Sequence, residues 1–359
     1  MLKSVYLEIN NYCNSYCSYC YNSCRNNKYI DLNDFNKLIN RLKNIGIQTI
    51  ILSGGEPTIH PKFINLLKIL ISKNMNFGMS TNGIAINDEI LKIFSENNAF
   101  IQVSLDTTDK NVYKEIRGVD KLNIVINNIS KIINYNINLD VGIVLTNQSL
   151  NTLEKTIKDL YIMGVQTIHA EEIKDVGFAK KNFLNLYIDD YYEVLKKLYE
   201  LEKELYPNIS IGMIEDILYR IINKKLTHTC CNCMEGNMIQ IDLKGEMYHC
   251  KNQGTQSYMG NIYSENWKDS INKSKDFKIN FEKTKCHTCK YGYICRGGCR
   301  AKVNAISNNL YEKGSRCDEM KKFISLILKE KEAGKLNKIL FGIELSNAYN
   351  KMNGFQKWV

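Results

Sequence analysis

Three cysteines near the N-terminus have the spacing of ligands to one metal centre. Cys13, Cys17 and Cys20 read Cys-x3-Cys-x2-Cys directly after an alternation of apolar residues that is typical of a strand. Three thiolates leave one iron of a four-iron cluster open to a small chelating cofactor. A zinc ion would need a fourth ligand, for which Cys24 is available. The spacing alone therefore leaves both kinds of site open.

Seven further cysteines follow in the C-terminal third. Their order is Cys-x11-Gly-x4-Cys, a gap, Cys-x2-Cys-x5-Cys-x3-Cys, a second gap and a last cysteine, and they are Cys233, Cys250, Cys286, Cys289, Cys295, Cys299 and Cys317. The close pair Cys286 and Cys289 on its own would also suit a zinc ribbon. Few long periodic runs interrupt this region, and small segments of that kind are commonly held by metal.

Composition narrows the class of protein. The chain has 359 residues, 13 cysteines and a formal charge of +10. The N-terminus reads as a strand rather than a signal peptide, so an odd cysteine count argues against a disulfide framework and for a reducing, cytoplasmic location. No stretch reaches the roughly 18 unbroken apolar residues of a membrane span. Basic residues are scattered over amphipathic helices, and thiolate ligation lowers the charge, so we expect no nucleic-acid partner.

Short apolar runs alternate with amphipathic segments through the first half of the chain. Strands are expected at Val5–Asn10, Thr49–Ser53, Asn76–Thr81, Phe100–Leu105, Leu139–Leu145 and Thr167–Ala170. Asp31, Pro61 and Ser149 are expected at the starts of helices. Strand–helix units in series predict a parallel sheet, and six are too few for a closed eight-stranded barrel. The predicted fold class is α/β, a partial (β/α)6 TIM-like barrel with a cysteine-rich C-terminal domain.

The character of the sequence changes near Thr229. Residues 176–228 are expected to be mostly helical, and Gly245 to lie in a hairpin between Met238–Leu243 and Glu246–His249. Helical spacing resumes at Cys317. We therefore expect three units: a barrel, a cysteine-rich domain and a C-terminal helical tail, over residues 1–228, 229–325 and 326–359.

A glycine-rich segment, Ser53-Gly54-Gly55-Glu56-Pro57, lies at the end of the second expected strand, where ligands bind in parallel α/β folds. Glycines there either let a bound molecule approach the backbone or form a tight turn. With this segment, the chain resembles the radical S-adenosylmethionine (radical SAM) superfamily over its first 170 or so residues. The other matching features are the three-cysteine motif with Tyr19 before its last cysteine, Ser80-Thr81-Asn82-Gly83, Val103-Ser104-Leu105-Asp106 and Arg117-Gly118.

The resemblance implies that the chain binds S-adenosylmethionine and cleaves it to a 5′-deoxyadenosyl radical. The resemblance implies that Cys13, Cys17 and Cys20 hold the cluster. Of the bound S-adenosylmethionine, the amino group would contact Gly54, Gly55 and Glu56, and the carboxylate would contact Arg117. Its adenine would contact Tyr19, and its ribose would contact Ser104 and Asp106. Capping of a strand end is the alternative role for Ser104 and Asp106.

The later cysteines resemble the SPASM extension, which houses two auxiliary four-iron clusters, so the resemblance implies three [4Fe-4S] clusters in all. The implied ligands are Cys233, Cys250 and Cys299 for auxiliary cluster I, and Cys286, Cys289, Cys295 and Cys317 for auxiliary cluster II. Cys230, Cys231 or the substrate would complete cluster I, and the sequence leaves these open. Cys24 is either a small buried side chain or a hydrogen-atom donor.

Resemblance to SPASM proteins implies hydrogen abstraction from a ribosomally made peptide, giving a thioether or carbon–carbon crosslink or an epimerisation. The chain begins at the first barrel strand, so we expect leader recognition from a separate protein or another surface. An electron donor such as flavodoxin or ferredoxin is the other expected partner.

Three other functions are weighed against peptide modification. Sulfatase maturation, an oxidation of a Cys or Ser side chain, is the first, although Lys251 stands where those enzymes have an aspartate. Dehydrogenation of a small molecule is the second. A non-enzymatic metal scaffold is the third, and it leaves the Gly-Gly-Glu-Pro segment unexplained.

Overall fold

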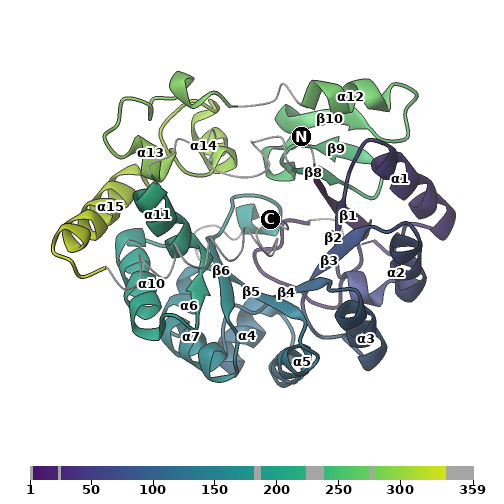
Figure 1. The fold of residues 1–359 in the computed structure, drawn as a ribbon, viewed down its shortest axis with the longest axis horizontal. Helices are drawn as coiled ribbons and strands as arrows, with labels where there is room; N and C mark the ends of the chain where they lie inside the picture. Colours follow the sequence, from purple (N-terminus) through teal and green to yellow (C-terminus); the bar gives the residue numbers. More distant parts are fainter. Residues whose placement is uncertain (1–2, 23–25, 182–186, 224–237, 275–278, 337–359) are drawn as a thin grey trace.

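The computed structural model describes residues 3–22, 26–181, 187–223, 238–274 and 279–336. Their strands form one ten-stranded sheet in the order β10-β9-β8-β1-β2-β3-β4-β5-β6-β7, with helices packed along its outside (Figure 1). All pairs from β1 to β7 are parallel. The barrel strands are β1 Ser4–Asn10, β2 Thr49–Gly54, β3 Asn76–Thr81, β4 Phe100–Ser104, β5 Asn138–Leu145, β6 Thr167–Glu172 and β7 Ser210–Ile211.

The predicted α/β partial barrel is confirmed, with the short β7 added to the six expected strands. The barrel helices are α1 Leu32–Asn44, α2 Phe63–Ser72, α3 Asp88–Glu96, α4 Lys110–Arg117, α5 Leu122–Asn134, α6 Asn147–Leu150, α7 Leu153–Ile162, α8 Phe178–Lys181, α10 Tyr191–Leu205 and α11 Gly212–Asn223, with a 3₁₀ turn η1 at Pro57–Ile59. No described helix has the length and apolar character needed to cross a membrane.

Helix α1 begins as its sequence predicts. The Asp31 side chain accepts hydrogen bonds from the backbone N–H groups of Asn33 and Asp34, at 2.8 and 2.9 Å. These bonds satisfy donors that the first helical turn leaves free. Phe35 and Leu38 are buried on one face and contribute to the core.

Two predicted helix starts were wrong. Pro61 precedes α2, which begins at Phe63, because the chain first forms the η1 turn that the Glu56 side chain caps. Ser149 lies inside the short helix α6, where it forms a reciprocal capping box with Thr146. The following helix α7 starts only at Leu153.

The two faces of the barrel sheet differ in polarity. On β1, the side chains of Val5, Leu7 and Ile9 are fully buried toward the surrounding helices. On the inner face, Ser80 Oγ donates to Gln102 Oε1 at 3.4 Å, and Gln102 Nε2 donates to Asp140 Oδ2 at 2.6 Å. The interior is therefore suited to polar ligands.

The cysteine-rich region continues the barrel sheet. Strand β8 (Met238–Ile241) pairs in parallel with β1, β9 (Glu246–Tyr248) pairs antiparallel with β8, and β10 (Tyr258–Asn261) pairs antiparallel with β9. The predicted hairpin is confirmed, with Gly245 at φ +80°. The sheet thus runs through the expected boundary, and the three-unit division stays a prediction. The remaining elements are η2 Lys251–Ser257, α12 Trp267–Ser274, η3 Phe281–Lys283, α13 Gly292–Cys295, α14 Arg300–Ser307 and α15 Cys317–Glu332.

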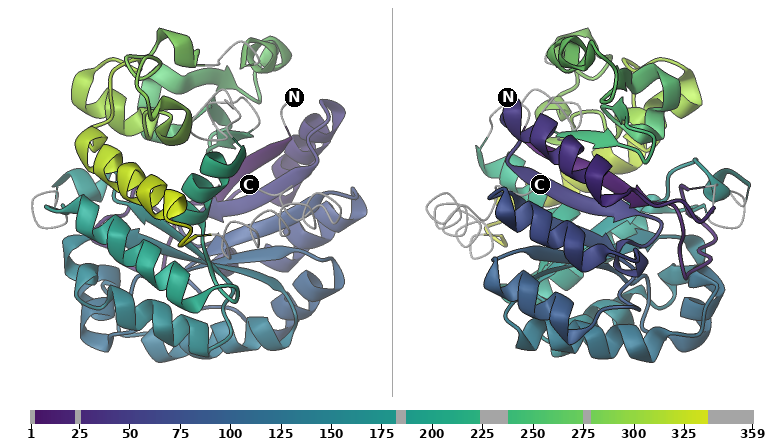
Figure 2. Two further views of the ribbon diagram at one scale, coloured as in Figure 1. Left: turned by 60° about the vertical axis from the view of Figure 1, so that its left-hand side comes forward. Right: turned by 90° about the vertical axis from the view of Figure 1, so that its right-hand side faces the viewer.

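Helix α15 joins the cysteine-rich region to the barrel on the opposite side from β8. It lies along α10, as the left view of Figure 2 shows. The rings of Tyr199 and Phe323 pack edge to face with centroids 5.9 Å apart, and Tyr199 Oη donates to Glu330 at 2.7 Å. The region is therefore anchored to the barrel at two separate places.

Leu7→Ala should lower the free energy of unfolding by about 2–5 kcal/mol, because it leaves a cavity in the middle of β1. Ile162→Ala, at a side chain that is 80% exposed, is the control and should change it by less than about 0.5 kcal/mol. Urea denaturation of both variants measures the difference, and equal losses would contradict the assignment of Leu7 to the core.

Candidate active site

The loop after β1 carries the three N-terminal cysteines. It lies at the carboxyl edge of the sheet, and Cys13, Cys17 and Cys20 are free and half-buried. The Ser15 N–H donates to Cys13 Sγ at 3.4 Å, and Arg117 Nη1 donates to Cys17 Sγ at 3.8 Å. Hydrogen bonds of this kind stabilise a thiolate more than a thiol.

Burial opposes ionisation of Cys13 and Cys17. It raises the pKa of the Cys13 thiol to about 11, and it also raises the pKa of Cys17 against the opposing charge of Arg117. In a metal-free loop these two thiols would therefore be neutral at pH 7. Metal coordination supplies the positive charge that thiolates need in such surroundings, so the donor set suits a metal centre.

The described His, Cys, Asp and Glu side chains contain no group of three that converges on a single metal ion. A four-iron cluster makes a different demand, because each thiolate binds a different iron. Cys24, the alternative zinc ligand, lies outside the described residues.

Gly54 and Gly55 pack against the cysteine loop. The N–H of Gly55 donates to Asn10 O and that of Glu56 to Tyr12 O, both at 2.9 Å. A Cβ at Gly55 would lie 2.0 Å from Tyr12 O, and one at Gly54, where φ is +134°, would lie 2.2 Å from Asn10 O. In the structure the molecule that approaches these glycines is the chain itself. Their contact with the amino group of a bound cofactor stays a prediction.

Two more barrel loops hold the cysteine loop from other sides. The N–H of Tyr16 donates to Arg117 O at 2.8 Å, and a Cβ at Gly118 would lie 2.7 Å from Tyr16 O. After β6, the N–H of Phe178 donates to Cys20 O at 2.8 Å. The loop has little regular structure of its own, so these contacts fix its path.

The Glu56 carboxylate is used inside the protein. It is fully buried and accepts hydrogen bonds from Thr58, from Thr81 Oγ1 at 2.6 Å and from the Asn82 N–H at 2.6 Å. Burial raises its pKa, and these donors act in the opposite direction. The side chain therefore ties the end of β2 to the end of β3, and only the backbone of this segment is left for the predicted cofactor contact.

Asn82 is a site residue that the sequence analysis did not single out. Its Nδ2 atom lies 2.7 Å from Asn14 Oδ1, 3.2 Å from Ser15 Oγ and 3.8 Å from Cys13 Sγ. It stands in the Ser-Thr-Asn-Gly segment that carried part of the resemblance, and this was the available signal. Its amide positions the first half of the cysteine loop.

Asp106 lies at the centre of a buried network. Its Oδ2 accepts from Tyr19 Oη at 2.7 Å and lies 2.7 Å from Arg117 Nε, while its Oδ1 accepts from the Val144 N–H at 2.9 Å. Arg117 also lies over the Tyr19 ring, 5.5 Å from its centroid. The predicted contact of Asp106 with ribose remains untested, but its carboxylate already serves to position Tyr19 and Arg117.

One donor of Arg117 has no partner. The side chain is 4% exposed, and Nη2 is buried without a hydrogen bond in the described part of the chain. A buried donor of this kind is costly unless an acceptor arrives. The orphaned atom fits an anionic ligand, as the carboxylate prediction for Arg117 requires. Ser104 lies half-buried at the end of β4, opposite Gly142 in the sheet.

The described C-terminal cysteines fall into two groups. Burial raises the pKa of Cys295, and nearby Cys286, Cys317 and Cys289 raise it further, so these four sulfurs are neighbours. Cys250 and Cys299 pack together in a separate small apolar cluster with Ala301. This is the grouping that the resemblance implied for two clusters. Cys233, Cys230 and Cys231 lie outside the described residues.

A turn of left-handed residues separates Cys295 from Cys299. Arg296, Gly297 and Gly298 have φ values of +54°, +76° and +74°. The fully buried Arg300 guanidinium closes the turn, donating to Gly297 O and, at 3.0 Å, to Leu310 O. A cation therefore lies beside Cys286, where it favours the ionised form of that thiol.

Lys251 links the cysteine-rich region to the barrel. Its ammonium pairs with the Glu8 carboxylate on β1 and lies 5.8 Å from the centroid of the Tyr21 ring. Tyr21 Oη in turn donates to Gly54 O at 3.2 Å. In the sequence Lys251 stands out only as a departure from an aspartate, and no local pattern shows that Glu8 is its partner.

Comparison with known proteins identifies the family. Residues 7–160 match the sequence profile of the radical SAM superfamily, and these residues carry the cysteine loop, the Gly-Gly-Glu-Pro segment and the Asp106 network. These residues form a radical SAM domain. The domain implies S-adenosylmethionine and a [4Fe-4S] cluster as cofactors, and with the enzymes among the relatives it confirms that this radical SAM protein is an enzyme.

Relatives extend the match beyond the barrel. A cysteine-type anaerobic sulfatase-maturating enzyme of Clostridium novyi is 26% identical over 349 residues, covering 87% of this chain and 91% of the relative. A probable GTP 3′,8-cyclase of Sulfurisphaera tokodaii is 30% identical over 168 residues, which are 46% of this chain and 52% of the relative.

Solved structures show the same fold. The enzyme anSMEcpe with bound AdoMet has a TM-score of 0.73 at 20% identity, covering 95% of this chain and 99% of that one. SuiB of Streptococcus suis bound to its precursor peptide SuiA has a TM-score of 0.68 at 17% identity, covering 88% of this chain and 76% of SuiB. These matches show that the fold is shared over both the barrel and the cysteine-rich region.

Asp106→Asn should lower the free energy of unfolding by about 3–5 kcal/mol, because it leaves the buried Arg117 charge uncompensated. Asp120→Asn is the control, since its pair with Lys110 is exposed at 3.5 Å and should contribute less than about 1 kcal/mol. Chemical denaturation of the two variants tests this, and equal effects would contradict the proposed importance of the buried pair.

Gly55→Ala should lower the iron content of the barrel, because the added Cβ collides with Tyr12 O and displaces the cysteine loop. Gly142→Ala is the matched control: it lies in β5, and its Cβ would meet only ordinary contacts at 3.6 Å or more. Iron analysis after anaerobic reconstitution decides the matter, and full iron in Gly55→Ala would show that the loop tolerates the side chain.

Proposed function

We propose that this radical SAM enzyme modifies a ribosomally made peptide, forming a thioether or carbon–carbon crosslink or an epimerised residue. When bound, S-adenosylmethionine and the reduced cluster would supply the 5′-deoxyadenosyl radical that abstracts a substrate hydrogen atom. The grouping of the C-terminal cysteines carries this proposal. Four are neighbours around Cys295 and two pack in a separate small cluster, as two auxiliary clusters would require.

The roles of the individual residues follow from their positions. Cys13, Cys17 and Cys20 would hold the first cluster, and Arg117 Nη2 is placed to receive an anionic group of the cofactor. Asp106 fixes the orientation of Arg117 and of Tyr19, whose ring would lie against adenine. Gly54, Gly55, Glu56 and Ser104 line the same carboxyl edge of the sheet.

The auxiliary ligands are also part of the proposal. Cys286, Cys289, Cys295 and Cys317 would hold one cluster, and Cys250 and Cys299, with Cys233, the other. The unit that holds them would be residues 229–325. A peptide substrate is supported by SuiB, whose structure was solved with SuiA, and the partners would include an electron donor and a separate leader-recognition protein.

Sulfatase-maturase-like oxidation of a Cys or Ser side chain is the second candidate. The relationship to the Clostridium novyi enzyme over most of both chains favours it. The pairing of Lys251 with Glu8 opposes it, because a paired ammonium next to Cys250 does not replace a carboxylate base.

The cluster proposal predicts the iron content. Anaerobically reconstituted parent should hold about twelve irons with matching sulfide, and a variant with Cys13, Cys17 and Cys20 changed to Ala about eight. Reduced parent should release 5′-deoxyadenosine and the variant should not. Four irons with one or two zinc ions in the parent would contradict the auxiliary clusters.

The substrate class is tested separately. Short peptides encoded beside the gene are incubated with reduced enzyme and S-adenosylmethionine, and the products are analysed by mass spectrometry. A loss of two hydrogens indicates a crosslink, and deuterium uptake from solvent without a mass loss indicates epimerisation. If the enzyme leaves these peptides unchanged but converts a Cys or Ser of a sulfatase peptide to formylglycine, the second candidate would be supported.

A further inference from the structure

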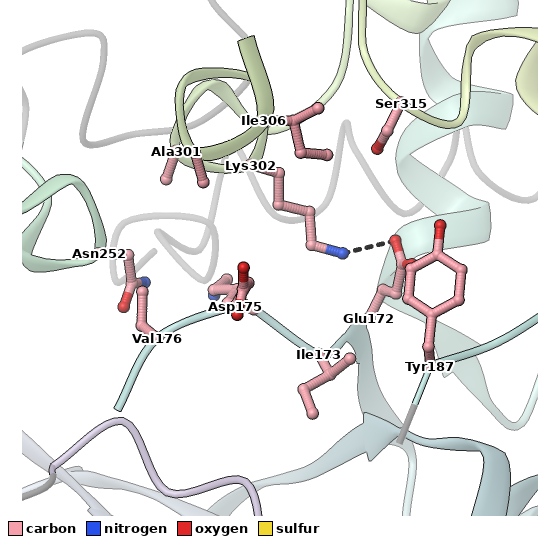
Figure 3. Close-up of a pocket in the computed structure, with 12 residues that line it drawn as sticks. Glu172, Ile173, Asp175, Val176, Tyr187, Asn252, Ala301, Lys302, Ile306 and Ser315 are labelled. Carbon is pink, nitrogen blue, oxygen red and sulfur yellow. Dashed lines mark ion pairs between the residues drawn. The ribbon is translucent and has the colours of Figure 1, made fainter. Parts of the chain in front are cut away.

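A pocket opens between the barrel and the cysteine-rich region (Figure 3). One wall is the loop that follows β6, from Glu172 to Val176, and the facing wall is helix α14. In Figure 3, Lys302 and Ile306 reach down from α14, while Asp175 and Ile173 lie on the loop below.

The pocket lies between the segments that carry two of the proposed clusters. Asn252 on its edge follows Cys250 by two residues, and Ala301 follows Cys299 by two. The loop at its base continues to Phe178, whose N–H donates to Cys20 O at 2.8 Å. A side chain bound here would belong to a substrate lying beside the reaction site.

The cations around the pocket already have partners. Lys302 Nζ lies 2.5 Å from Glu172 Oε2, and Arg316 Nη2 lies 2.8 Å from Glu172 Oε1. Lys174 Nζ lies 2.6 Å from Glu171 Oε2. These pairs leave no cation of the lining to neutralise a further carboxylate.

Asp175 is that further carboxylate. Its Oδ1 atom is buried and accepts no hydrogen bond, and the carboxylate forms no ion pair in the described ranges of the chain. An acceptor buried without a donor costs free energy until one is supplied. A charged acceptor gains most from a cationic donor, because charge-assisted hydrogen bonds are the stronger ones.

The rest of the lining is mostly apolar, with Asn252 and Ser315 as its polar exceptions. Ile173 is 4% exposed at the base, Val176 lies on the same loop, and Ile306 on α14 is 69% exposed at the rim. An apolar channel with a carboxylate in its wall matches a side chain with a long methylene stem and a cationic head. We propose that this pocket binds a lysine or arginine side chain of the substrate, with Asp175 as the partner of the cation.

This specificity rests on the proposed peptide substrate, but binding can be measured without catalysis. The probe is Nα-acetyl-lysine methylamide, and Nα-acetyl-norleucine methylamide is the neutral analogue with a similar stem. Saturation-transfer NMR on the reconstituted holoenzyme with S-adenosylmethionine gives both affinities. The parent should bind the lysine probe about tenfold more tightly than the norleucine probe, as expected for one charge-assisted hydrogen bond.

Three variants distinguish binding of the cationic head of the side chain from binding of its methylene stem. Asp175→Asn should remove the preference for lysine, while Asp189→Asn, at an exposed position outside the pocket, should retain it. Ile306→Ser should weaken both probes by a similar factor, because it removes apolar wall and leaves Asp175 in place. Equal affinity of the parent for both probes, or an undiminished preference in Asp175→Asn, would overturn the proposal.

The same measurements distinguish this inference from the function on which it rests. Lysine-selective binding by an enzyme that modifies no peptide would reject peptide modification and retain the specificity of the pocket. Peptide modification that is insensitive to replacing every basic residue by norleucine would reject the pocket assignment and retain the function.

Discussion

The active site depends on how one irregular loop is held. The segment from Asn11 to Tyr21 carries the three cysteines, yet its path is set by hydrogen bonds from loops that follow β2, α4 and β6. Two of these contacts are so close that only glycine fits, at Gly55 against Tyr12 and at Gly118 against Tyr16. Because the backbone of the cysteine loop is held by backbone groups of the neighbouring loops, the thiols remain available to bind metal. The same support also makes the position of the cysteines a property of the whole barrel edge, because a shift of any one of the three supporting loops would move them.

Buried carboxylates also position side chains at the carboxyl edge of the sheet. Asp106, Arg117 and Tyr19 come from three different segments and form one network that ends at the Cys17 sulfur. The Glu56 carboxylate likewise links the end of β2 to the end of β3, by accepting hydrogen bonds from Thr81 and Asn82. In both cases a carboxylate that the sequence offers as a ligand contact is satisfied by protein donors. Two of the buried atoms left without a hydrogen bond among the described residues are Arg117 Nη2 at the barrel edge and Asp175 Oδ1 near the cysteine-rich region.

The architecture followed from sequence because it rests on local signals. Periodicity located all six expected barrel strands, and the Asp31 cap fixed the start of α1. The misplaced starts at Pro61 and Ser149 arose where a short extra turn, η1 or α6, precedes the longer helix and takes over the capping residue. The site was harder to predict, since partners such as Glu8 and Lys251 are far apart in the chain and belong to common residue types. Spacing singled out the cysteines as candidate ligands because metal ligation favours such close spacing, whereas nothing local distinguishes Asp106 as a positioning residue from Asp106 as a ligand.

The pairing of β8 with β1 has a consequence for dissecting this enzyme. A fragment cut before β8 would expose the N–H and C=O groups of β1 along Ser4–Leu7, in the middle of what is otherwise a continuous sheet. Free strand edges of that kind recruit other chains. The catalytic barrel is therefore not a transplantable module: grafting it onto a different C-terminal region would require a replacement strand that matches the register of β1.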